Sequence, residues 1–223
     1  MRRIVPLSLV LLLATQAPAA PKPHVIAFGK PISVKCYTEP DETKTVDLKV
    51  RPLYVDTRLK EYTTGSPHEI TDRLFVVRRA FRLNDNLPQE SNSPPRWRWQ
   101  TSGWLLVDRV TARVSPLSLP NFDPLYSNAT WYRDYIAYCS ISDDGKKRYA
   151  IVAQLGRRKP VVKKLLEGPP GTTVLDIACA PPAWQRQPTR VTFEPQQGQK
   201  LTFSLRGHSV DIATNSDEEE ESE

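Results

Sequence analysis

The sequence predicts an all-β protein, folded as an antiparallel β-sandwich or a barrel-like meander with little helix after residue 19. Apolar and polar residues alternate with a period of two over several runs, which is typical of half-buried strands. Proline is abundant, with 21 residues in the chain, and it gathers between these runs. Because proline interrupts helices and strand interiors, its placement favours strands separated by loops.

The sharpest strand signal is a hairpin between residues 135 and 155. Apolar residues alternate over residues 135–141 and again over 149–155. Between these runs stand Asp144 and Gly145, and glycine adopts the positive φ that tight turns need. The pattern predicts two antiparallel neighbours joined by a short turn.

The C-terminal part predicts a meander of three short strands, near residues 191–193, 201–205 and 210–212. Gly198 and Gly207 mark the turns between them. These strands share one apolar face, which needs a partner sheet to cover it.

Four strands are expected earlier in the chain, at residues 25–28, 32–38, 45–55 and 73–83. Proline is confined to strand edges and bulges because it lacks the backbone donor. Pro52 therefore marks a bulge or an edge within the third of these strands.

A long alternating run covers residues 103–114, after a turn predicted at residues 100–103. Trp104 and Leu106 lie on its apolar face, which Asp108 interrupts. A carboxylate there would suit a pair of acids that hydrolyse glycosides, if a second acid lay 5–10 Å away. A structural carboxylate bonded to an arginine is the favoured interpretation, because buried acids need partners.

Residues 1–19 have the layout of a signal peptide. Arg2 and Arg3 precede an apolar stretch over residues 4–14, and Ala17-Pro18-Ala19 forms an A-x-A cleavage site. The apolar stretch is shorter than the 20 or so residues that a membrane span needs. We therefore expect export to the periplasm or the extracellular space, with no membrane span after cleavage.

The mature chain is expected to form a single β-rich domain over residues 20–216, with a possible subdivision near residues 84–95. Residues 217–223 hold six acids and predict a disordered acidic tail. Between residues 21 and 216 there are 29 basic and 19 acidic residues, a net charge of +10. This basic body could bind an anionic polymer while the tail competes, or it could simply be soluble.

Three cysteines are present, Cys36, Cys139 and Cys179, and alternation places all three on core-facing positions. In an oxidising compartment, one disulfide with one thiol left over is expected. We predict a Cys139–Cys179 bond, with three buried thiols as the alternative.

The aromatic residues offer the best candidate binding site. Trp97 and Trp99 alternate with Arg96 and Arg98, and Trp104 follows. A row of exposed indoles can stack on sugar rings, and adjacent guanidiniums suit anionic ligands. Alternatively, these tryptophans pack in the core, as most large aromatic residues do.

No catalytic residue, metal site or cofactor is assigned from the sequence. His24, His68 and His208 lack metal-ligand spacing, and no nucleophile motif is present. The leading hypothesis is a non-catalytic binding or interaction module for an anionic polymer, a glycan or a protein. Alternatives are an envelope-directed hydrolase whose residues converge only in three dimensions, and a structural subunit of an exported assembly. Export argues against nucleic acid as a partner.

Overall fold

The computed structural model describes residues 24–37, 45–90, 93–166, 179–195, 199–206 and 209–212. The predicted signal peptide, residues 1–19, and the acidic tail, residues 217–223, lie outside them. Most of the described residues are in strands, and the one helix among them is a short 3₁₀ helix at Pro88–Glu90, so the all-β prediction is confirmed. Within the described residues, no helix has the length and apolar character needed to cross a membrane.

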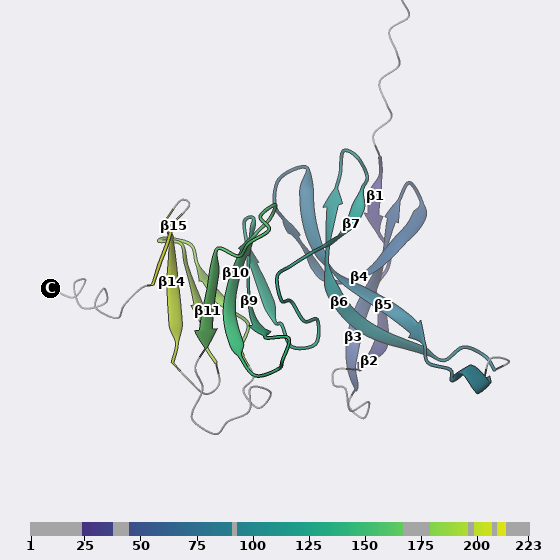
Figure 1. Ribbon diagram of the computed structural model, residues 1–223. Coiled ribbons are helices and arrows are strands. Elements are labelled where there is room, and N and C mark those ends of the chain that lie inside the picture. The colour runs from purple at the N-terminus through teal and green to yellow at the C-terminus, as the bar shows by residue number, and fades with distance from the viewer. Residues whose placement is uncertain are drawn as a thin grey trace, which may run out of the picture.

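The N-terminal half forms one strongly curved sheet (Figure 1). Its strands are β1 (Ile26–Phe28), β2 (Ile32–Tyr37), β3 (Thr45–Val55), β4 (Arg58–Glu69), β5 (Leu74–Asn84), β6 (Trp97–Asp108) and β7 (Val114–Leu117). Each strand from β2 to β6 pairs antiparallel with the next, and β2 returns to β6 at Cys36 and Trp99. These five strands therefore close into a barrel-like meander.

The closing β2–β6 pairing is parallel, whereas the other pairings of this sheet are antiparallel. The reason is geometric, because strand direction alternates around a meander. With an odd number of strands in the ring, the first and last must run the same way.

Side chains from opposite walls fill the barrel. One cluster is formed by Leu53, Phe75, Val77, Leu105 and Val107, all of them buried. A second cluster at the other end gathers around Val50, Ala80 and Trp99. The barrel interior is thus filled by apolar side chains, as a small closed sheet requires.

The C-terminal half forms two four-stranded antiparallel sheets. The second sheet comprises β8 (Ala129–Tyr132), β9 (Tyr135–Ile141), β10 (Arg148–Gln154) and β11 (Val162–Leu166). The third comprises β12 (Ala183–Gln185), β13 (Arg190–Phe193), β14 (Leu201–Arg206) and β15 (Ser209–Ile212). The predicted hairpin is confirmed as β9–β10, and the predicted C-terminal meander as β13–β15.

The second and third sheets share an apolar core. Ala137, Cys139 and Val152 from the second sheet pack with Phe193 and Phe203 from the third. Cys139 and Cys179 form a disulfide within this cluster, with Cα atoms 6.3 Å apart. The predicted bond is therefore confirmed, and the meander has the covering sheet that its apolar face required.

The β9–β10 hairpin is buried on both faces. Its other face, with Ile136, Tyr138 and Ile151, packs against residues of the barrel and of the connecting loop, including Trp104 and Phe122. The second sheet thus lies between the third sheet and the barrel wall.

The alternating run predicted over residues 103–114 differs in the structure. β6 is continuous from Trp97 to Asp108, with no turn at residues 100–103. Leu105 and Val107 face the barrel interior, whereas Trp104 lies on the outer face, and Val110 is exposed in a turn. Period-two alternation did not identify the face that points into the barrel, because both faces of this strand are covered by apolar neighbours.

Residues 84–95, where a subdivision was considered, connect β5 to β6 within one sheet. Asn84 pairs with Trp97 across this connection. The chain leaves this sheet for the second one between β7 and β8.

Candidate functional site

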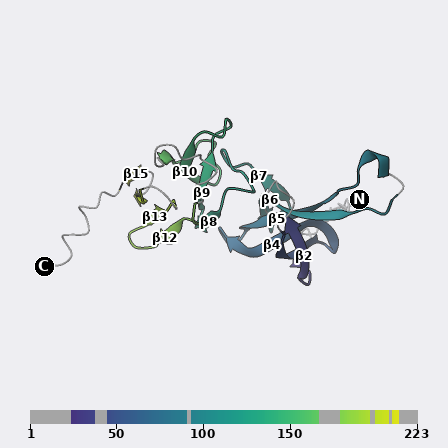
Figure 2. The ribbon, with the colours of Figure 1, turned by 90° about the horizontal axis from the view of Figure 1, so that it is seen from below.

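The distal end of the β5–β6 hairpin, residues 81–90 and 93–98, projects from the barrel and is called the arm (Figures 1 and 2). Ala80 is the last residue of β5 at this end that pairs with β4, and Trp99 is the residue of β6 that pairs with β2. Beyond these two positions, the described strand residues of the arm pair only across the β5–β6 hairpin, with no third strand beside them. The arm is therefore a two-stranded ribbon, which is marginally stable unless it packs against something.

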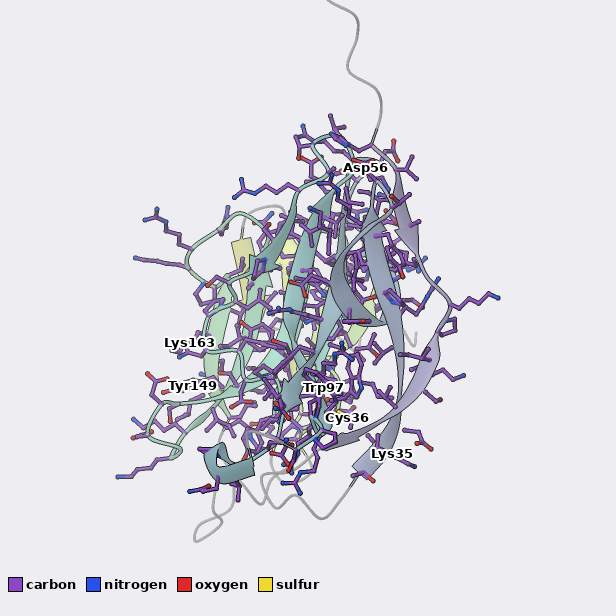
Figure 3. The ribbon with its side chains drawn as sticks, turned by 90° about the vertical axis from the view of Figure 1, so that its right-hand side faces the viewer. Lys35, Cys36, Asp56, Trp97, Tyr149 and Lys163 are labelled. Atoms are coloured by element: carbon purple, nitrogen blue, oxygen red, sulfur yellow. A yellow bond between two sulfur atoms is a disulfide. The ribbon has the colours of Figure 1, made fainter. Side chains whose placement is uncertain are left out.

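The structure distributes the predicted aromatic row over three environments. Trp97 is on the arm with 49% of its surface exposed, whereas Trp99 is buried at 9% in the barrel core. Trp104 lies in the junction with the second sheet, edge-on to Trp131 at 5.5 Å between ring centroids. Figure 3 shows Trp97 near Cys36 and at the opposite end of the molecule from Asp56. Of the three predicted tryptophans, Trp97 alone is exposed.

The two predicted arginines are engaged within the arm. The Arg98 guanidinium forms an ion pair with Asp85 and is 15% exposed. The backbone N–H of Arg96 donates to the side-chain oxygens of Asn84 and Asn86. These contacts fix the arm's conformation.

An arginine that was not singled out from the sequence completes the exposed surface. The Arg82 guanidinium lies 4.4 Å from the ring centroid of Trp97 and 6.0 Å from that of Tyr62. Tyr62 in turn contacts Trp99 edge-on at 5.0 Å. A chain of aromatic contacts, with Arg82 between Tyr62 and Trp97, thus runs from the barrel core to the arm. Such contacts hold an exposed indole in one orientation.

Exposed apolar residues also gather on the arm. Leu83 is 47% exposed and Leu87 is 60% exposed. Leu83 pairs with Arg98, so it lies on the opposite face of the ribbon from Trp97. Large apolar side chains on a projecting ribbon are unfavourable in water unless a partner covers them.

A second feature, which the sequence did not predict, is a cleft of about 670 Å³ between the barrel and the C-terminal half. It is lined mainly by His68, Glu69, Tyr132, Arg133, Arg186 and Gln187. These residues come from the end of β4, the β8–β9 turn and the β12–β13 turn (Figure 2). Three such distant segments give no local motif, so only their convergence in space reveals the cleft.

The acid of this cleft is neutralised by its neighbour. Both carboxylate oxygens of Glu69 accept hydrogen bonds from Arg109, each at 2.8 Å. These bonds hold the pKa of Glu69 below its usual range. An ionised, paired carboxylate is poorly suited to act as a general acid.

Asp108, the acid singled out from the sequence, is bonded to an arginine, as favoured. Arg73 Nε donates to Asp108 Oδ1 at 2.9 Å, and the two residues form an ion pair. The backbone N–H groups of Val110 and Thr111 also donate to Asp108 Oδ1. The pKa of Asp108 is held well below its usual value, first by Arg73 and then by these backbone donors. Asp108 thereby ends β6 and shapes the turn to β7.

Replacing Asp108 with asparagine is expected to make the melting temperature of the protein less dependent on pH in acid solution. A carboxyl with a depressed folded-state pKa stabilises the fold above its unfolded pKa, about 3.9, and loses this contribution as the pH falls further. The variant should therefore have a lower Tm at pH 7, and the two Tm values should converge towards pH 2. Thermal unfolding between pH 2 and 7 measures this difference.

The matched control is Asp143→Asn, which removes an exposed acid from the β9–β10 turn. We expect its profile to parallel that of the wild type. A constant difference between Asp108→Asn and wild type at every pH would contradict the role assigned to the Asp108 carboxylate.

Within the described residues, no group of three or more His, Cys, Asp or Glu side chains is placed to hold a metal ion. No protein-family model matches the chain, and no curated protein or solved structure is significantly similar to it. The structure therefore defines a fold class and no functional class: this is an all-β protein with one disulfide.

Proposed function

We propose that this chain is an exported, non-catalytic interaction module that binds a protein partner through the arm. The observation that carries the proposal is Trp97, a half-exposed indole held against Arg82 on a two-stranded ribbon that projects from the barrel. Tryptophan and arginine are the residues most enriched at the energetic centres of protein interfaces.

The surroundings of Trp97 favour a protein over a glycan. Leu83 and Leu87 add exposed apolar area on the same arm, whereas a sugar platform uses a row of flat aromatic faces. Arg82 lies over one region of the indole and has no carboxylate partner among the described residues. An apolar partner surface with an acidic rim would complement both features.

Export is supported by the disulfide and by the predicted signal peptide. Disulfides persist in oxidising compartments and are rare in the cytosol. The Cys139–Cys179 bond is enclosed in the core shared by the second and third sheets, so it belongs to the folded structure.

The two acids that could act as general acids in a hydrolase, Asp108 and Glu69, give little support to the enzymatic alternative. Asp108 is paired with Arg73 and Glu69 with Arg109. Each carboxylate is already bonded to a guanidinium and remains ionised, so neither offers the proton that a hydrolytic acid must donate.

The test compares the mature protein with Trp97→Ala and with Val110→Ala. Val110 is a suitable control because it is 65% exposed but lies in the β6–β7 turn, away from the arm. Each protein is immobilised and presented with exported proteins of the producing cell, with polysaccharides and with anionic polymers.

We expect a specific exported protein to bind wild type and Val110→Ala, and to bind Trp97→Ala at least tenfold more weakly, on the scale of about 2 kcal/mol typical of interface centres. Retained circular dichroism would show that the variant folds. Equal binding by all three proteins would refute the arm as the site. Binding to a polysaccharide that Trp97→Ala abolishes would refute a protein partner.

A further inference from the structure

The cleft between the barrel and the C-terminal half collects positive charge. Arg133 comes from the β8–β9 turn and Arg186 from the β12–β13 turn, and both are exposed. Neither guanidinium pairs with a carboxylate among the described residues. The acid of the cleft, Glu69, is bonded on both oxygens to Arg109. The cleft therefore has two cationic side chains without a compensating anion.

Arg133 is held in place by its backbone. Its φ is 52°, in the left-handed region that non-glycine residues seldom occupy. Its carbonyl accepts a hydrogen bond of 2.8 Å from Nε2 of His68, so this ring nitrogen carries the proton. Positive φ is the geometry that a two-residue hairpin turn requires, so the β8–β9 turn fixes the backbone of Arg133.

Aromatic stacking fixes the same turn from both sides. The His68 ring stacks on Trp131 at 5.7 Å, and Tyr132 stacks on Trp184 at 5.4 Å between ring centroids. The Arg133 guanidinium lies 5.4 Å from the centre of the Tyr132 ring. The turn that presents this guanidinium is thus joined to β4 of the barrel and to β12 of the third sheet. A preorganised cation binds its ligand with a smaller entropic cost.

We propose that this cleft binds a small oxyanion ligand, a compound bearing a carboxylate, phosphate or sulfate group, through Arg133 and Arg186. Guanidinium groups bind such oxyanions through paired N–H donors. A volume of about 670 Å³ accepts an inorganic oxyanion and also leaves room for a molecule of metabolite or sugar size that carries one. The site is distinct from the arm and does not depend on the function proposed for it.

The test uses inorganic phosphate, inorganic sulfate and glucuronate as probes, with glucose as the neutral counterpart of glucuronate. Each probe is titrated into the ¹⁵N-labelled mature protein at low ionic strength, and amide and indole shifts are followed by NMR. The variants are Arg133→Gln with Arg186→Gln, and Arg158→Gln as the control. Arg158 is exposed in the β10–β11 turn and lies outside the cleft.

We expect at least one anionic probe to shift resonances of residues 68–70, 131–134 and 184–188, whereas glucose shifts none. The double variant should bind this probe at least about tenfold more weakly, and Arg158→Gln within about twofold of wild type. The probe that binds most tightly identifies the oxyanion class. Unchanged binding by the double variant, shifts spread over the whole surface, or no binding of any probe at millimolar concentration would overturn the proposal.

Discussion

Replacing Cys139 and Cys179 together with alanine is expected to lower the free energy of unfolding by about 4 kcal/mol. The two residues are 40 positions apart. A cross-link of this span lowers the conformational entropy of the unfolded chain, and this stabilises the folded state by about 4 kcal/mol. Both residues also lie in the core shared by the second and third sheets. The disulfide joins β9 to the segment beside Pro195, so its loss should loosen the attachment of the third sheet. Urea denaturation under non-reducing conditions measures the change.

The matched control is Cys36→Ala, which removes a buried sulfur that is not disulfide-bonded. We expect this variant to lose about 1 kcal/mol, the central value for single substitutions. Burial raises the pKa of the Cys36 thiol, so this cysteine should resist alkylation until the protein unfolds. Mass spectrometry of the unfolded, unreduced protein should then find one alkylated thiol, and finding three would contradict the disulfide.

Strands with a clear turn between them could be predicted from the sequence. The β9–β10 hairpin follows from Asp144-Gly145, and Gly145 adopts a φ of 69° in the structure. The expected strand over residues 45–55 is β3, and its register shifts between Leu53 and Tyr54, one residue after Pro52. In each case a single residue with restricted or unusual backbone geometry marked the position.

β4 was missed because its turn has an uncommon composition. Asp56 and Thr57 form the two-residue connection to β3, with φ values of 48° and 67°. Glycine and asparagine usually occupy such positions, so the pair does not read as a hairpin turn. The Asp56 carboxylate stabilises the turn by accepting hydrogen bonds from Val25 N–H and His24. This compensation involves the segment before β1, which is distant in sequence, and local patterns cannot reveal it.

The candidate sites depended on burial, which alternation alone could not assign. The sequence placed Trp97 and Trp99 on the same strand face, and both contribute to one chain of aromatic contacts that includes Arg82. Only the arm's projection beyond the last barrel pairing leaves Trp97 exposed and Trp99 enclosed. The cleft was harder still, because Arg133 and Arg186 are ordinary turn residues until the sheets pack.

Replacing Trp99 with alanine is expected to destabilise the protein by about 3–5 kcal/mol, the range for truncating a buried large aromatic residue. Trp99 packs with Val50 and Ala80 in the second barrel cluster and contacts Tyr62 edge-on. It is also the residue of β6 that pairs with Cys36 where β2 and β6 meet. The substitution should therefore leave a cavity and weaken the closure of the barrel. Chemical denaturation followed by circular dichroism measures the loss.

Trp97→Ala provides the matched comparison, because it removes the same side chain two residues away on the same strand. Trp97 is half exposed, and its cation–π contact with Arg82 contributes about 0.5–1 kcal/mol at a surface position. We expect a loss near 1 kcal/mol for this variant, together with the loss of partner binding. Similar destabilisation by both variants would mean that the arm's indole is structural, and the arm would then lose its role as a binding surface. A large difference between them would separate the tryptophan that closes the barrel from the one that is available to a partner.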